Sequence, residues 1–204
     1  MKNIYVSFVK VSIVVLFLGL SQTVFAQLSG IKTIPADYPS ISAFVTDLNL
    51  QGVGAGGVTL NVPAGYTENL TGKITLTATG TAANPIVIQK IGVGANPVIV
   101  SYVGTVATPE VTADGMFVLA GSDYVTIDGI DLAENVANTT TTTVMEFGFG
   151  LYLASASDGC QNNTIKNCVI TLNRIQNSNW NNLGHTGSIG INILNSLYNL
   201  SASA

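Results

Sequence analysis

The chain has 204 residues and a formal net charge of −4, with 9% charged and 47% hydrophobic residues. That apolar content excludes a disordered chain, and the length allows one domain with a sizeable core. Nucleic-acid and anionic-membrane surfaces need clustered Lys and Arg, and this chain has only 7 such residues. We therefore expect a folded domain that does not bind nucleic acid and whose surface is polar through hydroxyl and amide groups.

The first 26 residues have the order of a secretory signal peptide. Lys2 and Lys10 provide basic residues, an apolar run covers 11–20, and the segment ends in Val24-Phe25-Ala26. The run is shorter than a membrane-spanning helix needs, and no later stretch is long enough. We predict cleavage after residue 26, export to the cell surface or extracellular space, and no transmembrane segment in the mature chain. A retained N-terminal anchor is the alternative.

One amphipathic helix is predicted early in the mature chain. Ser40 can cap it, and Gly52 begins the glycine-rich run that ends it. Its apolar residues follow the helical spacing i, i+3, i+4 and i+7: Ile41, Phe44, Val45 and Leu48. We assign residues 27–57 to a lead-in and a capping helix, because the exposed end of a stacked β-structure needs a cover.

Short strands are predicted from residue 58 onward. Apolar stretches bounded by Gly, Asn or Pro occur at 58–62, 74–76, 86–88 and 98–100. Their intervals would also suit a β-sandwich. The repeat described next favours a solenoid instead, because a sandwich has no reason to show it.

The second half of the chain repeats itself. Residues 125–132 recur 38 positions later as 163–170, and a repeat of this length is typical of a solenoid. Segments led by Gly115, Gly150 and Gly190 open the copies, and the last copy is unfinished. The matching positions are Thr126, Ile127, Ile130 and Leu132 with Thr164, Ile165, Cys168 and Ile170, and Leu151 and Leu153 with Ile191 and Ile193.

The strand phase inside this repeat predicts a bend. Apolar residues alternate over 125–127, Asp128-Gly129 intervenes, and alternation resumes over 130–132 shifted by one position. Lys166-Asn167 holds the same place in the next copy, and Gly and Asn best tolerate a left-handed backbone. Such a strand turns around a core and keeps its apolar side chains inside on both arms.

The predicted fold is therefore all-β: a right-handed parallel β-helix, or solenoid, with an N-terminal capping helix and an incomplete C-terminus. Residues 58–204 form its coils. The segments 135–143 and 174–183 are expected to be loops, which usually gather on one face of a repeat protein.

The chain resembles the right-handed parallel β-helix proteins of the pectin-lyase-like superfamily, and among them large secreted surface proteins of Bacteroidetes. The resemblance is carried by Asp37-Tyr-Pro-Ser-Ile-Ser, by residues 62–68 and by the coil motif 163–168. It is weak for function, because the fold hosts lyases, hydrolases, esterases and non-catalytic adhesins. Such relatives usually carry more coils and a C-terminal sorting domain, so the resemblance implies a truncated chain.

The enzymes of that superfamily suggest two kinds of site. Lyases hold Ca²⁺ with clustered carboxylates, but the aspartates near the strand ends here are scattered. We therefore predict no metal site and no cofactor, and Ca²⁺ is unsupported. Inverting hydrolases pair two carboxylates and show a Gly-His-Gly-x-Ser-Ile-Gly segment, which 184–190 resembles with one insertion. The catalytic candidates are Asp158 and His185, and they do not make a complete catalytic set.

Aromatic residues and cysteines complete the candidate sites. Tyr124 and Trp180 are candidates for stacking on sugar rings, with extracellular polysaccharide or cell-surface components as partners. The sequence does not decide whether Cys160 and Cys168 form a disulfide. Two packed thiols are favoured, because Cys168 takes the place of Ile130 in the repeat.

The leading hypothesis is an exported, non-catalytic β-helix module with a structural or adhesive role and carbohydrate contact. It rests on two observations: the sequence pattern strongly indicates the fold, and the candidate residues do not make a complete catalytic set. The alternative is a polysaccharide lyase or glycoside hydrolase whose site is completed beyond residue 204.

Overall fold

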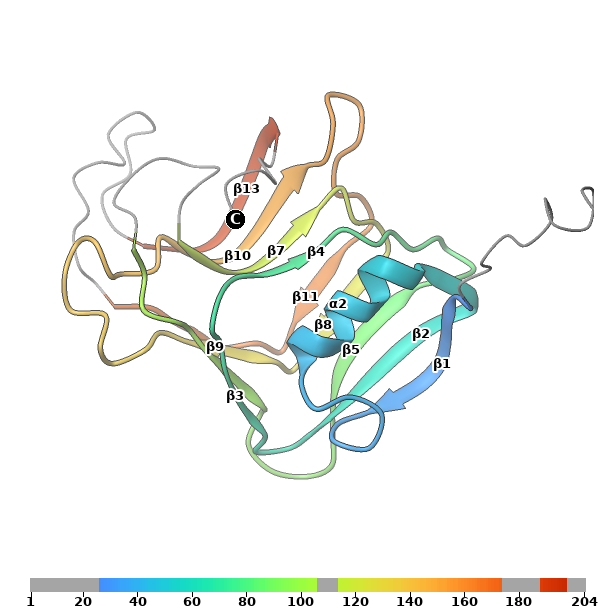
Figure 1. Cartoon of the computed structure of the whole chain (residues 1–204), viewed down its shortest axis with the longest axis horizontal. Helices are drawn as coiled ribbons and strands as arrows, with labels where there is room; N and C mark the ends of the chain where they lie inside the picture. Colours follow the sequence, from blue (N-terminus) through green and yellow to red (C-terminus); the bar gives the residue numbers. More distant parts are fainter. Residues whose placement is uncertain (1–25, 106–113, 174–187, 198–204) are drawn as a thin grey trace, which may run out of the picture.

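The computed structural model describes residues 26–105, 114–173 and 188–197, and the predicted signal peptide lies outside them except for its last residue (Figure 1). Within these ranges the chain forms one helix, α2 (Ile41–Gln51), and thirteen strands that pair in parallel within three sheets. The predicted all-β class with parallel strands is therefore confirmed. The structure also shows which strands share a sheet.

Each sheet is built from strands far apart in the sequence. Sheet A has the order β1 (Leu28–Thr33), β2 (Val53–Pro63), β5 (Ile86–Ile91), β8 (Val125–Asp128) and β11 (Thr164–Lys166). Sheet B has the order β3 (Thr67–Asn69), β6 (Val98–Val100), β9 (Asp131–Ala133) and β12 (Ile170–Thr171). Sheet C has the order β4 (Ile74–Leu76), β7 (Gly115–Ala120), β10 (Phe147–Leu153) and β13 (Ile189–Leu197), which lie side by side in Figure 1.

Consecutive strands visit the three sheets in a fixed order. Strands β2, β3 and β4 lie in sheets A, B and C, and every later set of three returns in that order. We call each set of three a circuit, so that β2–β4 are the first circuit and β11–β13 the fourth. Each strand is hydrogen-bonded to its counterparts in the neighbouring circuits.

The core lies between the three sheets. In sheet A, Leu60, Ile88 and Ile127 occupy paired positions and are each at most 1% exposed. The paired Ile99 and Leu132 of sheet B are fully buried as well. Alternate residues of a strand point to opposite faces, so the period-two pattern supplies one inward row from every strand.

The 38-residue repeat is confirmed in sheets A and B. Ile127 pairs with Ile165, and Leu132 pairs with Ile170. The glycine-led alignment in sheet C is wrong, because Gly115 pairs with Phe147 and Gly150 pairs with Val118.

The physical reason is that these glycines make room for rings. A Cβ on Gly115 would lie 2.0 Å from the ring of Phe147, and one on Gly150 would lie 2.5 Å from the ring of Tyr152. The predicted match of Leu151 with Ile191 in the same sheet is wrong as well, because Leu151 pairs with Ile193.

Helix α2 begins and ends where the sequence predicts. The Ser40 side chain accepts a hydrogen bond from the Ala43 N–H at 3.0 Å, and the Gly52 N–H donates to the Leu48 carbonyl at 2.8 Å. The four apolar residues of its predicted inner face are all buried. The helix contacts β2 and β4, so it covers the first end of the stack (Figure 1).

The lead-in, for which the sequence predicts no strand or helix, contains a strand. Residues 28–33 form strand β1, and the glycine-rich run after the helix belongs to β2. The β1–β2 register shifts across this run, since Leu28 pairs with Val53 and Gly30 pairs with Val58, so residues 54–57 bulge out of the ladder. Residues 135–143 connect β9 to β10, as the loop prediction requires.

The segment 174–183 connects β12 to β13 and lies outside the described residues. Both predicted loops therefore belong to connections between sheet B and sheet C. In the parts that the structure describes, no helix has the length and hydropathy that crossing a membrane requires.

Candidate functional site

Polar side chains gather at two corners of the stack. The first, the A–B bend, is the turn from sheet A to sheet B and includes Asn96, Asp128, Asp131, Lys166 and Asn167. The second, the B–C corner, lies at the base of the connections from sheet B to sheet C. It contains five of the eight buried polar residues in the part of the chain that the structure describes: Ser101, Asp114, Glu134, Asn138 and Glu146.

The A–B bend has the backbone that the sequence predicts. Gly129 has φ 68° and Asn167 has φ 56°, the left-handed conformation that Gly and Asn tolerate. The Gly129 N–H donates to the Lys166 carbonyl at 3.0 Å, so the two bends stack directly.

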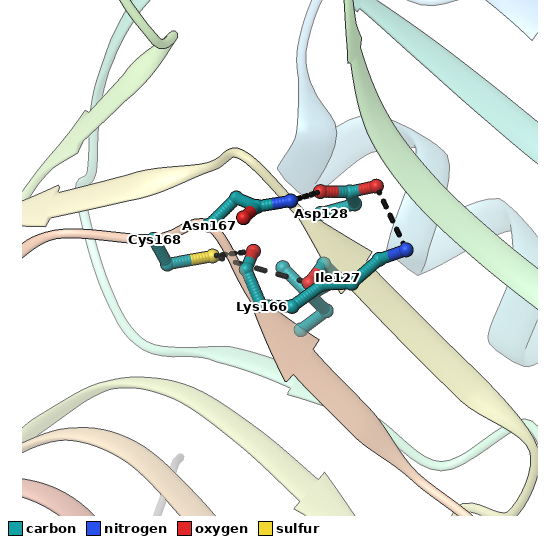
Figure 2. Close-up of polar contacts among 5 residues, drawn as sticks. All are labelled: Ile127, Asp128, Lys166, Asn167 and Cys168. Atoms are coloured by element: carbon teal, nitrogen blue, oxygen red, sulfur yellow. Dashed lines mark hydrogen bonds and ion pairs between the residues drawn. The ribbon is translucent and has the colours of Figure 1, made fainter.

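Asp128 is held by the bend of the next circuit (Figure 2). Asn167 Nδ2 donates to Asp128 Oδ1 at 2.7 Å, and Lys166 Nζ lies 3.2 Å from Asp128 Oδ2. The hydrogen bond from Asn167, followed by the interactions with Lys166, holds the pKa of Asp128 below its ordinary value. Asp128 is therefore an ionised partner within the bend and a poor proton donor at neutral pH.

Asp131 links three circuits. Its Oδ1 accepts from Asn96 Nδ2 at 2.7 Å and from the Val169 N–H at 2.9 Å. Asn96 Nδ2 also donates to the Asn167 carbonyl at 2.9 Å. These contacts join the second, third and fourth circuits through side chains, in addition to the strand ladders.

At the B–C corner, Glu134 joins the third circuit to the fourth. Its Oε1 accepts from the Met145 N–H at 2.6 Å, and its Oε2 accepts from the Asn173 N–H at 2.5 Å. Burial raises the pKa of Glu134, and the hydrogen bonds from these two backbone groups oppose that rise. Both carboxylate oxygens are therefore engaged by backbone N–H groups.

Asn138 is fully buried beside Glu134. Its Nδ2 donates to the Tyr102 carbonyl at 3.1 Å and to Glu134 Oε1 at 3.2 Å. Among the described residues, its buried Oδ1 has no hydrogen-bond partner. A single orphaned acceptor in an otherwise satisfied network costs stability and accommodates at most one small donor, such as water.

Asp114 and Glu146 occupy stacked positions just before β7 and β10. Asp114 Oδ2 accepts from the Thr105 N–H at 2.6 Å, and Glu146 Oε2 accepts from the Asp114 N–H at 2.6 Å. Lys73 Nζ lies 5.8 Å from the centroid of the Phe147 ring. Burial lowers the pKa of Lys73, while the charges of Asp114 and Glu146 act in the opposite direction.

Of the four residues predicted for catalysis and binding, the structure describes Asp158 and Tyr124, and each lies on a connection from sheet C to sheet A. Asp158 is exposed on the connection from β10 to β11, where its carbonyl accepts from the Ala154 N–H at 2.8 Å. Tyr124 is half-buried between β7 and β8 with φ 51°. His185 and Trp180 lie outside the described residues.

Both cysteines are free thiols in the structure. Cys160 Sγ donates to the Leu119 carbonyl at 3.3 Å, and Cys168 Sγ donates to the Lys166 carbonyl at 3.1 Å (Figure 2). Burial raises the pKa of both thiols. They pack as weak donors and small apolar groups, which is the alternative to a disulfide.

The carboxylates that the structure describes are not grouped in the way a metal site requires. Across residues 26–105, 114–173 and 188–197, no three His, Cys, Asp or Glu side chains are grouped closely enough to hold a metal ion. Asp131 Oδ1 accepts from an amide and a backbone N–H group, and both oxygens of Glu134 accept from backbone N–H groups.

Sequence reasoning missed the B–C corner. A polar residue stands directly before each of the last three strands of sheet C: Asp114, Glu146 and Ser188. Their spacings differ from the 38-residue repeat, because the connections from sheet B vary in length. A search for polar residues before apolar strands, without a fixed period, could have found them.

The chain matches no protein-family model, no curated protein and no solved structure.

Proposed function

We propose that this chain is an exported, right-handed parallel β-helix that serves as a non-catalytic module of a cell-surface or extracellular protein. The circuits support the β-helix, because the chain passes through three parallel sheets in a fixed order. Right-handed winding follows from the general preference of parallel crossover connections. Export is supported by the signal-peptide pattern of residues 1–26.

One observation carries the non-catalytic role: carboxylates at both corners accept from the backbone of the next circuit. Asp131 of the third circuit accepts from Val169, and Glu134 accepts from Asn173. A catalytic carboxylate must instead reach a substrate or a water with an available oxygen. Carboxylates used in this way hold circuits in register, which is what a structural or adhesive stalk requires.

Carbohydrate contact is proposed on the outer face of sheet A. One paired row consists of Thr59, Val87, Thr126 and Thr164, and the next consists of Asn61, Gln89, Asp128 and Lys166. Neighbouring strands in a sheet are about 4.8 Å apart, so these rows repeat polar groups at short intervals, interrupted only at Val87. An extended polysaccharide could be hydrogen-bonded by such rows, whether soluble or attached to a cell surface.

A glycan array tests the binding part of this proposal. We expect Thr126→Lys to reduce any glycan signal, because it replaces a hydroxyl in the middle of the first row. Thr142→Lys is the matched control, since Thr142 is exposed on the loop between β9 and β10. Equal loss of signal in both variants would remove the outer face of sheet A as the binding surface.

The alternative function is a polysaccharide lyase or glycoside hydrolase completed beyond residue 204. Incubation with acidic polysaccharides distinguishes it, with unsaturated ends reporting lyase activity and new reducing ends reporting hydrolysis. We expect neither product. Cleavage that disappears in Asp158→Ala or His185→Ala would overturn the non-catalytic role, whereas cleavage that persists in both would point to a contaminating enzyme.

A further inference from the structure

Gln27 directly precedes the first strand and lies outside the packed part of the fold. Ala26 and Gln27 are both exposed, whereas Leu28, the first residue of β1, is 8% exposed. The Leu28 N–H donates to the Gly52 carbonyl at 3.0 Å, which ties the start of the strand to the end of α2. The peptide bond between Ala26 and Gln27 therefore joins two exposed residues just ahead of a fixed strand.

Signal-peptide cleavage after residue 26 would make Gln27 the first residue of the mature chain. This step rests on the proposed export, because the small residue that ends Val24-Phe25-Ala26 is what places the cut. Cleavage there removes no residue of any strand or helix that the structure describes. It leaves a free α-amino group on a residue whose side chain is a primary amide.

The surroundings of Gln27 leave room for a ring at this position. A Cβ on Gly52 would lie 3.9 Å from Gln27 Nε2, and one on Gly54 would lie 3.3 Å from Gln27 Cβ. The Gln27 side chain thus lies beside two backbone positions that carry no side chain. Because the residue is also exposed, its side chain has the freedom to turn back toward its own nitrogen.

The chemistry of an N-terminal glutamine then favours cyclisation. The unprotonated α-amino nitrogen attacks Cδ of the side-chain amide, a new C–N bond closes a five-membered lactam, and the bond from Cδ to Nε2 breaks. Nε2 leaves as ammonia and takes the proton that the α-amino nitrogen gives up. An α-amino group is partly unprotonated near neutral pH, and attack within one residue has a high effective concentration. The step needs no oxidant, metal ion or cofactor.

We propose that the exported chain begins with a pyroglutamyl lactam at residue 27. The lactam is uncharged and lacks the α-ammonium group that aminopeptidases recognise. It therefore protects the start of β1, the first strand of sheet A, from stepwise removal. The Leu28 N–H keeps its hydrogen bond to the Gly52 carbonyl, because cyclisation uses only atoms of residue 27.

Mass spectrometry of the exported protein tests the proposal. The full chain, with residues 1–26, is produced in a secreting host, recovered after export and incubated at neutral pH. We expect an intact mass that is lower by one ammonia than that of the chain starting at Gln27, and fragmentation that places the loss on residue 27. Gln27→Asn is the matched control, because it keeps a side-chain amide but would have to close a strained four-membered ring. It should retain its ammonia.

Aminopeptidase digestion gives a second measurement. We expect the unchanged chain to keep residue 27 and Gln27→Asn to lose it. A mature chain that starts at Gln27 with its full mass, or that is digested like the control, would overturn the lactam and leave the proposed export intact. A chain that keeps residues 1–26 would overturn both, and a cut at another position would overturn the lactam alone.

Discussion

The two ends of the stack are built from similar strands and differ in what covers them. At the first end, α2 places four buried apolar residues over the core and uses Asn49 to satisfy the edge of β4. At the other end, the described fourth circuit has open edges and an Ile193 that is 72% exposed. An apolar strand residue in a stacked fold thus becomes a core residue only when a neighbour lies on each side of it.

Equivalent residues in the third and fourth circuits show this dependence on neighbours most directly. Ile127 and Ile165 are paired and chemically identical, yet the first is buried and the second is half-buried. The four predictions below test this contrast, from the largest expected effect to the smallest.

The largest effect is expected from truncating the buried member of that pair. Ile127→Ala should lower the free energy of unfolding by about 3–4 kcal/mol, because it leaves a cavity in the core. Ile165→Ala should cost about 1 kcal/mol, because solvent already reaches part of its side chain. Urea unfolding measures both. Equal losses would mean that the last circuit is as well covered as the third.

The second-largest effect is expected from removing the carboxylate of Glu68, which holds the first turn of the capping helix. Glu68→Ala should lower the free energy of unfolding by about 2–3 kcal/mol, because it leaves the N–H groups of Ile41 and Ser42 without their acceptor. Glu68→Gln retains one oxygen acceptor and should lose about half as much. Hydrogen exchange of α2 amides is the sharper readout. Wild-type exchange rates in Glu68→Ala would show that the helix is held by its apolar face alone.

A smaller effect is expected at the edge of β4. Asn49→Ala should cost about 1–2 kcal/mol, because Thr75, Thr77 and Ala78 lose their side-chain partner. Thr46→Ala on the same helix is the matched control and should change the free energy of unfolding by less than about 0.5 kcal/mol. Chemical denaturation compares the two. An equally large loss in Thr46→Ala would show that the loss in Asn49→Ala does not come from edge capping.

The smallest effect concerns the A–B bend and pH. The pKa of Asp128 is lower in the folded protein, so its ionised form stabilises the fold above its ordinary pKa of 3.8. That stabilisation is lost as the pH falls through the lower folded pKa. Because the pair is partly exposed, we expect only a few tenths of a kcal/mol.

Unfolding experiments on either side of about pH 4 measure this contribution. Asp128→Asn should remove it, whereas Lys166→Gln should retain most of it, because the hydrogen bond from Asn167 is the larger cause of the shift. A pH dependence unchanged in Asp128→Asn would show that another carboxylate is responsible.

The candidate site was harder to predict than the fold. Asp158 and Tyr124 were selected from motifs and residue type, and the structure places them on separate connections. Glu134 and Glu146 lie in connections outside the repeat, so no pattern drew attention to them. Their hydrogen-bond partners are up to 39 positions away, and connection length decides which partners they meet.

The sequence by itself determined the features that a few adjacent residues specify. These are the helix between Ser40 and Gly52, the inward rows of the strands, and the left-handed bends at Gly129 and Asn167. Capping, side-chain period and backbone conformation are local properties, so local patterns predict them.

Only the tertiary structure decided the register of sheet C, the pairing of β1 and the polar network at the B–C corner. Gly115 aligns with Phe147 because a ring needs the space that the glycine leaves. Residues 28–33 become a strand because the edge of β2 is beside them. These outcomes depend on packing between residues that are distant in sequence, which no local pattern contains.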